Sequence, residues 1–299
     1  MSLTELTINV AGVTTRVLRG GKAGAPTTLF LHGGIPGVTP FCSGAHIWGN
    51  SLAPFLEDRD VIVPDLPGSG GTVQASGPLT VEVLARHGVD LMSALSLEAA
   101  DVVGHDLGGL IGILMALTQP ARVRSLSIVA SPMSAPTGDG LDSILFLAPP
   151  QPPWSRESQA WALERLSYVH THIDAALVDA CAAAGEGEAH RRAVDYMNQH
   201  YVRTFGPSLA RTRYLLWETC RDKGVQVPVQ IVWASHDPAV SREAGFVLFG
   251  ALARKQRAAQ MHVINRAGSL PFRDQPAAFH HIVSSFESGV LAEQSHVAA

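Results

Sequence analysis

The chain has 299 residues, of which 46% are hydrophobic and 16% are charged, and its net charge is −4. A chain of this size buries a large core without disulfides, and its charge balance excludes an electrostatic basis for binding nucleic acid or an anionic membrane. The three cysteines lie far apart, at positions 42, 181 and 220, and neither an export signal nor a spanning apolar run is present. We therefore expect a cytoplasmic protein with reduced thiols.

Short β-rich runs alternate with longer helical patterns along the chain. Strands are predicted at 5–10, 13–18, 27–31, 61–63, 101–103, 126–129, 229–233 and 261–264. Helices are predicted at 46–56, 80–95, 107–118, 241–252 and 275–286. The first two strands have the alternation of an antiparallel pair, and the others are typical of a parallel sheet flanked by helices. The tail from 288 to 299 is expected to fray.

The alternation of strands and helices stops between residues 134 and 221. A Pro-rich stretch at 148–154 leads there into helical sequence that is rich in aromatic residues and histidines. We interpret this segment as a helical cap inserted after the sixth strand. The predicted domains are a core at 1–133 and 222–299 and a cap at 134–221.

An acidic residue occupies a tight turn between a strand and a helix. Asp106 follows the predicted strand 101–103 and is flanked by Gly104, Gly108 and Gly109. A carboxylate exposed on such a turn can attack carbon and form an alkyl ester, whereas a serine there forms an acyl ester. The alternative is that Asp106 only caps the helix that follows it.

Four motifs in chain order resemble the α/β-hydrolase superfamily. They are HGGIPG at 32–37, PDLPGSG at 64–70, GHDLGG at 104–109 and WASHD at 233–237. The resemblance covers 5–133 and 222–287, and it implies a mostly parallel eight-stranded sheet, catalysis by Asp106 without a cofactor or metal, and an oxyanion hole made by the amides of Gly34 and Leu107. For the loop at 32–37, the alternative is a simple turn after a strand.

The resemblance also implies that Asp237 is the carboxylate that orients a catalytic histidine, although Asp-Pro is also a common turn. That histidine is missing, because Ser269 occupies its position in the loop after the last strand. A serine alone does not activate the water that hydrolyses an alkyl-enzyme ester. Three explanations remain: another histidine substitutes, the reaction has no hydrolytic step, or the chain is inactive by nature or by engineering.

Five histidines are candidates for the missing base: His46, His170, His172, His236 and His262. Histidines in such places are more often structural than catalytic. Two others are set aside, since His105 should point away from the cleft as the strand neighbour of Asp106, and His32 belongs to the turn of the oxyanion loop.

The aspartate resembles the nucleophile of epoxide hydrolases and dehalogenases. Leu107 weighs against a dehalogenase, because the resembling enzymes carry a tryptophan or an arginine there. Epoxide hydrolases use cap tyrosines, a role open to Tyr168, Tyr196, Tyr201 and Tyr214, whereas the loop at 32–37 is closer to that of carbon-carbon hydrolases. Substrate contacts are expected from four cap residues: Trp154, Tyr168, His170 and Tyr201.

The leading hypothesis is an epoxide-hydrolase-like enzyme that acts on a small, mostly apolar substrate, with Asp106, Asp237 and Ser269 at its catalytic centre. The main alternative keeps the fold and makes Asp106 the general base of a lyase, isomerase or cyclase. A hydrolysis-deficient variant or a ligand-binding protein is the third. The predicted partner is a small molecule, and a homodimer is left open.

Overall fold

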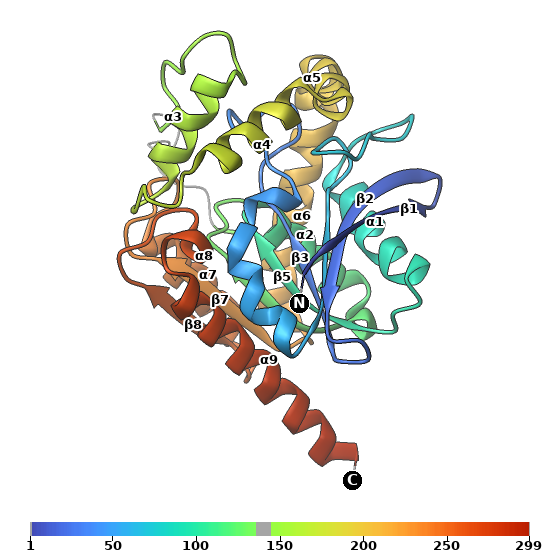
Figure 1. Ribbon diagram of the computed structural model, residues 1–299. Helices are drawn as coiled ribbons and strands as arrows, with labels where there is room; N and C mark the ends of the chain where they lie inside the picture. The colour runs from blue at the N-terminus through green and yellow to red at the C-terminus, as the bar shows by residue number, and fades with distance from the viewer. Residues whose placement is uncertain (1, 136–144, 299) are drawn as a thin grey trace.

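A computed structural model describes residues 2–135 and 145–298. Its centre is an eight-stranded sheet with the order β1-β2-β4-β3-β5-β6-β7-β8. The strands are β1 (Thr4–Val10), β2 (Val13–Gly21), β3 (Thr27–Leu31), β4 (Asp60–Pro64), β5 (Ala100–His105), β6 (Val123–Val129), β7 (Val229–Ala234) and β8 (Gln260–Ile264). β2 pairs antiparallel with β1 and β4, and every other pair is parallel. The predicted mostly parallel α/β-hydrolase sheet is therefore confirmed (Figure 1).

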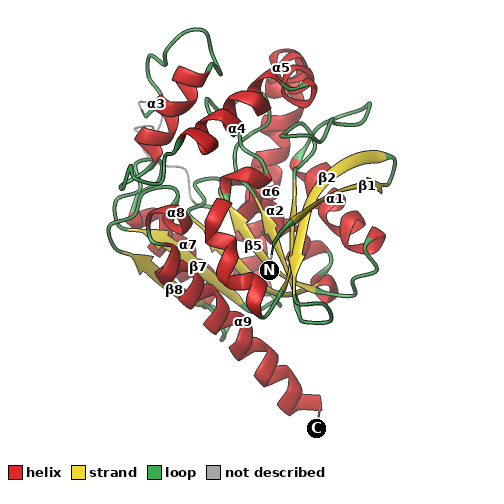
Figure 2. Cartoon of the chain, in the orientation of Figure 1, coloured by secondary structure: helices red, strands yellow, loops and turns green. Residues whose placement is uncertain are grey.

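Helices cover both faces of the sheet, as Figure 2 shows. One face packs against α1 (Val81–Ala94), α2 (Leu107–Thr118) and α7 (Arg242–Ala253). The other packs against the 3₁₀ helices η1 (Ala45–Ile47) and η2 (Gly49–Glu57), the short α8 (Pro271–Asp274) and the long α9 (Pro276–Ala298). A short 3₁₀ turn, η3 (Pro120–Arg122), precedes β6.

The side chains of strand β3 contribute to the hydrophobic cores on both faces of the sheet. Leu29 and Leu31 belong to the core on the α1 and α2 side, whereas Phe30 points to the opposite face. There its ring lies edge-on to Trp48 and Phe55, each with a centroid distance of 5.1 Å. Because successive side chains of a strand alternate between faces, a continuous apolar run is what a sheet covered on both sides requires.

The cap lies between β6 and β7 in the chain. It contains α3 (Arg156–Leu166), α4 (Ala175–Glu186), α5 (Glu188–His200), a π-helical turn (Tyr201–Phe205) and α6 (Gly206–Asp222). In Figure 1, α3, α4 and α5 lie beyond one end of the sheet, above the carboxyl ends of its parallel strands. Helix α6 leads from the cap back to the core and packs against α1, α2 and α7.

Two predicted segments differ from the structure. The helix predicted at 46–56 is instead the pair of 3₁₀ helices η1 and η2, because Gly49, the first residue of η2, has φ +51° and Pro54 lacks an amide hydrogen. The tail predicted to fray continues α9 to Ala298. Phe286, Glu287 and Val290 are buried on the body of the protein, and this anchors the start of that extension.

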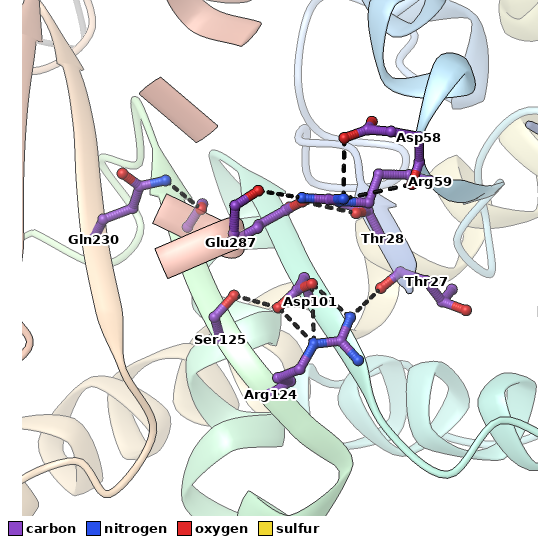
Figure 3. Close-up of polar contacts among 11 residues, drawn as sticks. Thr27, Thr28, Asp58, Arg59, Asp101, Arg124, Ser125, Gln230 and Glu287 are labelled. Atoms are coloured by element: carbon purple, nitrogen blue, oxygen red, sulfur yellow. Dashed lines mark hydrogen bonds and ion pairs between the residues drawn. The ribbon is translucent and has the colours of Figure 1, made fainter. Parts of the chain in front are cut away.

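A buried polar network lies at the amino-terminal end of the parallel strands (Figure 3). Asp101 at the start of β5 binds Arg124, with Oδ2 at 2.5 Å from Nη2. Glu287 of α9 accepts hydrogen bonds from Arg59 and Thr28, each at 3.0 Å. Among the described residues, no helix is both long and apolar enough to cross a membrane.

Candidate active site

Asp106 adopts the strained backbone conformation that the turn after β5 requires. Its φ of +49° and ψ of −114° lie outside the regions that residues with a side chain prefer. The side chain makes no capping hydrogen bond to α2, although Asp106 stands at the N-cap position. The geometry therefore argues against a simple cap and matches the strand-to-helix elbow of nucleophiles.

Two glycines make this elbow sterically feasible. A Cβ added to Gly104 would lie 2.2 Å from the carbonyl oxygen of Gly108, and one added to Gly108 would lie 2.2 Å from that of Leu31. Both distances are far shorter than any allowed contact, so these positions require glycine for strand and helix to approach each other.

The carboxylate of Asp106 is held by backbone amides. Its Oδ2 accepts a hydrogen bond of 2.8 Å from the amide of Gly34, and the nearby amide of Leu107 lowers the pKa of the same carboxyl. Oδ1 is enclosed and has no hydrogen-bond partner among the described residues. The two amides predicted to form the oxyanion hole thus lie next to the carboxylate of Asp106 itself, with one of its oxygens anchored by Gly34 and the other unpartnered.

The surroundings of Asp106 raise the pKa of its carboxyl toward neutral pH. Burial raises the pKa of its carboxyl from 3.8 to about 6, against the lowering effect of the Gly34 and Leu107 amides. The group is ionised at pH 7.5, yet it is a stronger base than an exposed aspartate.

Asp237 and Ser269 meet beside Asp106. Ser269 Oγ donates to Asp237 Oδ1 at 2.5 Å, and the amide of Ala239 donates to the same oxygen at 2.9 Å. Burial and, to a smaller extent, the negative charge of Asp106 raise the pKa of Asp237 to about 6, against the lowering effect of the hydrogen bonds to Asp237. Ser269 is fixed in turn by its amide, which donates to the carbonyl of Leu166 at 2.7 Å. The loop after β8 therefore carries a serine hydroxyl where a histidine was expected.

A cavity of about 680 Å³ opens above these residues, and Asp106, Asp237 and Ser269 all line it. Most of its wall is apolar, contributed by Val38, Phe41, Met133, Leu145, Phe146, Leu166, Leu209 and Val240. Arg213 of α6 is the one lysine or arginine among the described residues that line it. The cavity fits a small, mostly apolar organic molecule.

None of the four residues expected to bind substrate lines this cavity. Trp154 donates its indole hydrogen to the carbonyl of Thr39 at 3.1 Å, and Tyr201 packs against the core and stacks on Phe205. Tyr168 is 43% exposed and packs on His236, and His170 is exposed. Tyr196 and Tyr214 also lie outside the cavity lining, so no cap tyrosine is in position to bind an epoxide oxygen.

The five histidines proposed as substitutes also lie outside the cavity lining. His46 bonds the carbonyl of Cys42 at 3.1 Å, and His172 pairs with Asp274 at 3.1 Å. His170, His236 and His262 lie at exposed positions or in surface bonds. Each has a structural or solvent-exposed setting, and none of them hydrogen-bonds to Asp106.

Sequence reasoning missed two residues of the cavity wall. His105, expected to point away from the cleft, contributes to the lining, although its ring packs on Phe272 and its Nε2 bonds the carbonyl of Ser269 at 2.8 Å. Arg213 had a detectable signal, because it falls on the apolar stripe of α6 between Leu209 and Leu216. The described residues contain no group of three or more metal-ligating side chains that could hold an ion.

Comparison with known proteins identifies relatives across almost the whole chain. The model of the alpha/beta hydrolase family matches residues 28–282. The 2-hydroxymuconate semialdehyde hydrolase of Pseudomonas sp. (strain CF600) is 27% identical over 281 residues, which are 93% of this chain and 92% of the relative. The 2-hydroxy-6-oxo-2,4-heptadienoate hydrolase of Pseudomonas putida is 27% identical over 266 residues, 88% of this chain and 89% of the relative.

A solved structure shares the fold. The meta-cleavage product hydrolase CumD of Pseudomonas fluorescens IP01 superposes with a TM-score of 0.76 at 23% identity, and the match covers 95% of this chain and 97% of that one. At this identity the likeness establishes the architecture of the sheet and cap.

Proposed function

The chain is an enzyme that belongs to the alpha/beta hydrolase family, and on that premise we propose that it hydrolyses small apolar electrophiles of the epoxide type with Asp106 as nucleophile. One observation carries the proposal. The Asp106 carboxylate has Oδ2 anchored by the Gly34 amide at 2.8 Å, while Oδ1 has no partner among the described residues. A nucleophile needs one oxygen held in place and the other unpartnered.

The amides of Gly34 and Leu107 serve both halves of this reaction. In the resting state they stabilise the carboxylate and hold its plane in the elbow. When water attacks the alkyl ester of Asp106, the negative charge develops on the same oxygen that these amides already contact. They then act as an oxyanion hole that needs no rearrangement.

The substrate proposed here carries an acidic group. Arg213 brings a guanidinium into an otherwise apolar wall, and its bond to a described residue is to the carbonyl of Ala135. A charge-assisted bond to a carboxylate is the contact that a guanidinium makes best. One relative is described by name as acting on a heptadienoate, which is also a carboxylate.

Isotope labelling tests the nucleophilic role of Asp106. Excess enzyme is mixed with styrene oxide, or with its 4-carboxylate, in ¹⁸O water for a single turnover. The expected first product contains ¹⁶O from Asp106, and the label enters the protein at that residue. An intact-mass adduct that is absent in Asp106→Asn supports the assignment, whereas direct incorporation of ¹⁸O into the first product would refute it.

A second function is favoured by the raised pKa of Asp106, about 6, together with the absence of a histidine bonded to Asp237 among the described residues. In this alternative Asp106 is a general base in a lyase or isomerase reaction, and the missing histidine is no defect. Such a reaction forms no Asp106 adduct and consumes a substrate without taking oxygen from labelled water.

A further inference from the structure

Asp237 occupies a position where a carboxylate normally orients a histidine, yet no histidine is bonded to it among the described residues. Its Oδ1 is engaged by Ser269 Oγ at 2.5 Å and by the Ala239 amide at 2.9 Å. Its Oδ2 is enclosed and has no partner in the described parts of the chain. A buried carboxylate oxygen without a hydrogen bond is costly, so its retention at a cavity wall calls for an explanation.

The charged and titratable groups around Asp237 leave it as the available proton acceptor. Asp106 shares the cavity and opposes its ionisation. His105 donates from Nε2 to the Ser269 carbonyl, and its Nδ1 has no partner among the described residues. Burial lowers the pKa of His105 to about 4, so it is a weaker base than Asp237, whose pKa is about 6. Arg213 is a cation, and His236 turns to the surface against Tyr168. Of the carboxylates that line the described cavity, Asp237 is the one besides the nucleophile, and its Oδ2 has no hydrogen-bond partner among the described residues.

We propose that Asp237 is itself the general base that hydrolyses the Asp106 ester, an inference that rests on the proposed function. Water from the cavity gives one proton to Asp237 Oδ2 as its oxygen bonds to Cγ of Asp106. The charge formed on Oδ2 of Asp106 is held by the Gly34 and Leu107 amides. The ester bond between Cγ and the alkoxide oxygen then breaks, and the alkoxide takes the proton from Asp237.

The proton balance closes over the cycle. The carboxyl regenerated on Asp106 contains one oxygen from water, and it releases its remaining proton to solvent. That proton balances the one that the epoxide oxygen of the substrate takes from solvent when Asp106 is alkylated. Ser269 is a positioning residue in this scheme, because its hydroxyl occupies Oδ1 and leaves Oδ2 as the basic oxygen.

The lifetime of the ester tests the role of Asp237. Wild type, Asp237→Asn and the surface control Asp195→Asn are mixed with styrene oxide, quenched at intervals and analysed by intact mass. Alkylation should persist in Asp237→Asn, while decay of the ester slows by about 100-fold or more, the contribution typical of a general base. Equal decay in wild type and Asp237→Asn would overturn the inference and leave the proposed function standing. Absence of an adduct in every variant would overturn the proposed function itself.

Ser269→Ala gives a second measurement that does not depend on Asp237→Asn folding. The Ser269 hydrogen bond lowers the pKa of Asp237, so its loss should raise that pKa. Because the base acts when ionised, the pH at which ester decay reaches half its maximum should move upward in Ser269→Ala. Ser269→Thr, which keeps the hydroxyl, should restore it. An unchanged midpoint in Ser269→Ala would contradict the assignment.

Discussion

The two ends of strand β5 carry buried aspartates in opposite electrostatic surroundings. At its start, Asp101 binds Arg124 and Ser125, and the neighbouring Glu287 binds Arg59 (Figure 3). Just beyond its end, Asp106 is held by amides, and Asp237 next to it is held by a hydroxyl and amides. Each carboxylate of the first pair has an arginine, whereas no described cation bonds either member of the second.

Under the proposed function, the difference separates a structural cluster from a reactive one. A buried carboxylate that is fully paired with arginine is fixed in charge and position. Asp106 and Asp237, held by neutral donors alone, have a raised pKa and an unpartnered oxygen at the cavity wall. Glu287 also has a raised pKa, about 8, and an unpartnered Oε1, but it does not line the cavity. Access to the cavity therefore distinguishes the second pair as candidates for a nucleophile and a base.

Ser269→His should change the reactive pair most. The new imidazole would take over from Asp237 as base, with Asp237 orienting it, and general acid-base catalysis by histidine contributes about 10²- to 10⁴-fold. Because Asp237 already contributes about 100-fold as the base, we expect decay of the Asp106 ester to accelerate by up to about 100-fold, measured by rapid quench and mass spectrometry. No ester should form in the Ser269→His, Asp106→Asn double variant. Unchanged decay in Ser269→His would mean that the pocket cannot use a base at this position.

Arg124→Met should lower the stability of the protein by breaking the ion pair with Asp101, and it should leave the proposed catalytic residues unchanged. It leaves Asp101 buried without its cation, and breaking such a pair costs about 3 kcal/mol of the free energy of unfolding. Urea denaturation measures the loss, and activity per folded molecule should stay unchanged. The control is Arg156→Met, because Arg156 and Asp179 form an exposed pair and should contribute less than about 1 kcal/mol. Equal losses of unfolding free energy in Arg124→Met and Arg156→Met would show that the buried ion pair stabilises the protein no more than the exposed one does.

Asp106→Asn should stabilise the protein at neutral pH. The pKa of Asp106 is raised in the folded state from 3.8 to about 6, so ionisation disfavours folding increasingly as the pH rises from about 4 to 6. At 1.36 kcal/mol per pKa unit, removing the charge should add about 3 kcal/mol at pH 7.5 and less than about 1 kcal/mol at pH 4. Denaturation at both values tests this, with the exposed Asp195→Asn as control. A gain of the same size at pH 4 would assign the effect to packing.

The sequence predicts the reactive end of β5 better than its cavity. The sheet, the elbow at Asp106 and the meeting of Asp237 with Ser269 follow from local motifs, because glycines and short turns constrain the backbone there. The cap contacts do not follow from such motifs. Trp154 and Tyr168 are held by a backbone carbonyl and by His236, and these long-range packing choices leave no trace in local spacing. Likewise, Phe286 and Val290 anchor a tail whose composition predicts fraying.

Arg213→Met should have the smallest effect. It compares the arginine of the cavity wall with the arginines at the start of β5. At the start of β5 the arginines are bound to protein carboxylates, whereas Arg213 lies in the cavity wall without an ion pair to Asp106 or Asp237. It should therefore bind the acid group of a ligand, a contact of about 1.5 kcal/mol and hence about tenfold in affinity. Calorimetric titration with 4-phenylbutyrate should show this loss, while binding of the neutral 4-phenylbutyramide stays the same. Arg211→Met, on the same helix but paired at the surface with Glu82, should bind both ligands as the wild type does. If Arg213→Met weakens the acid and the amide equally, the guanidinium contributes shape rather than charge recognition, and the acidic substrate class is lost.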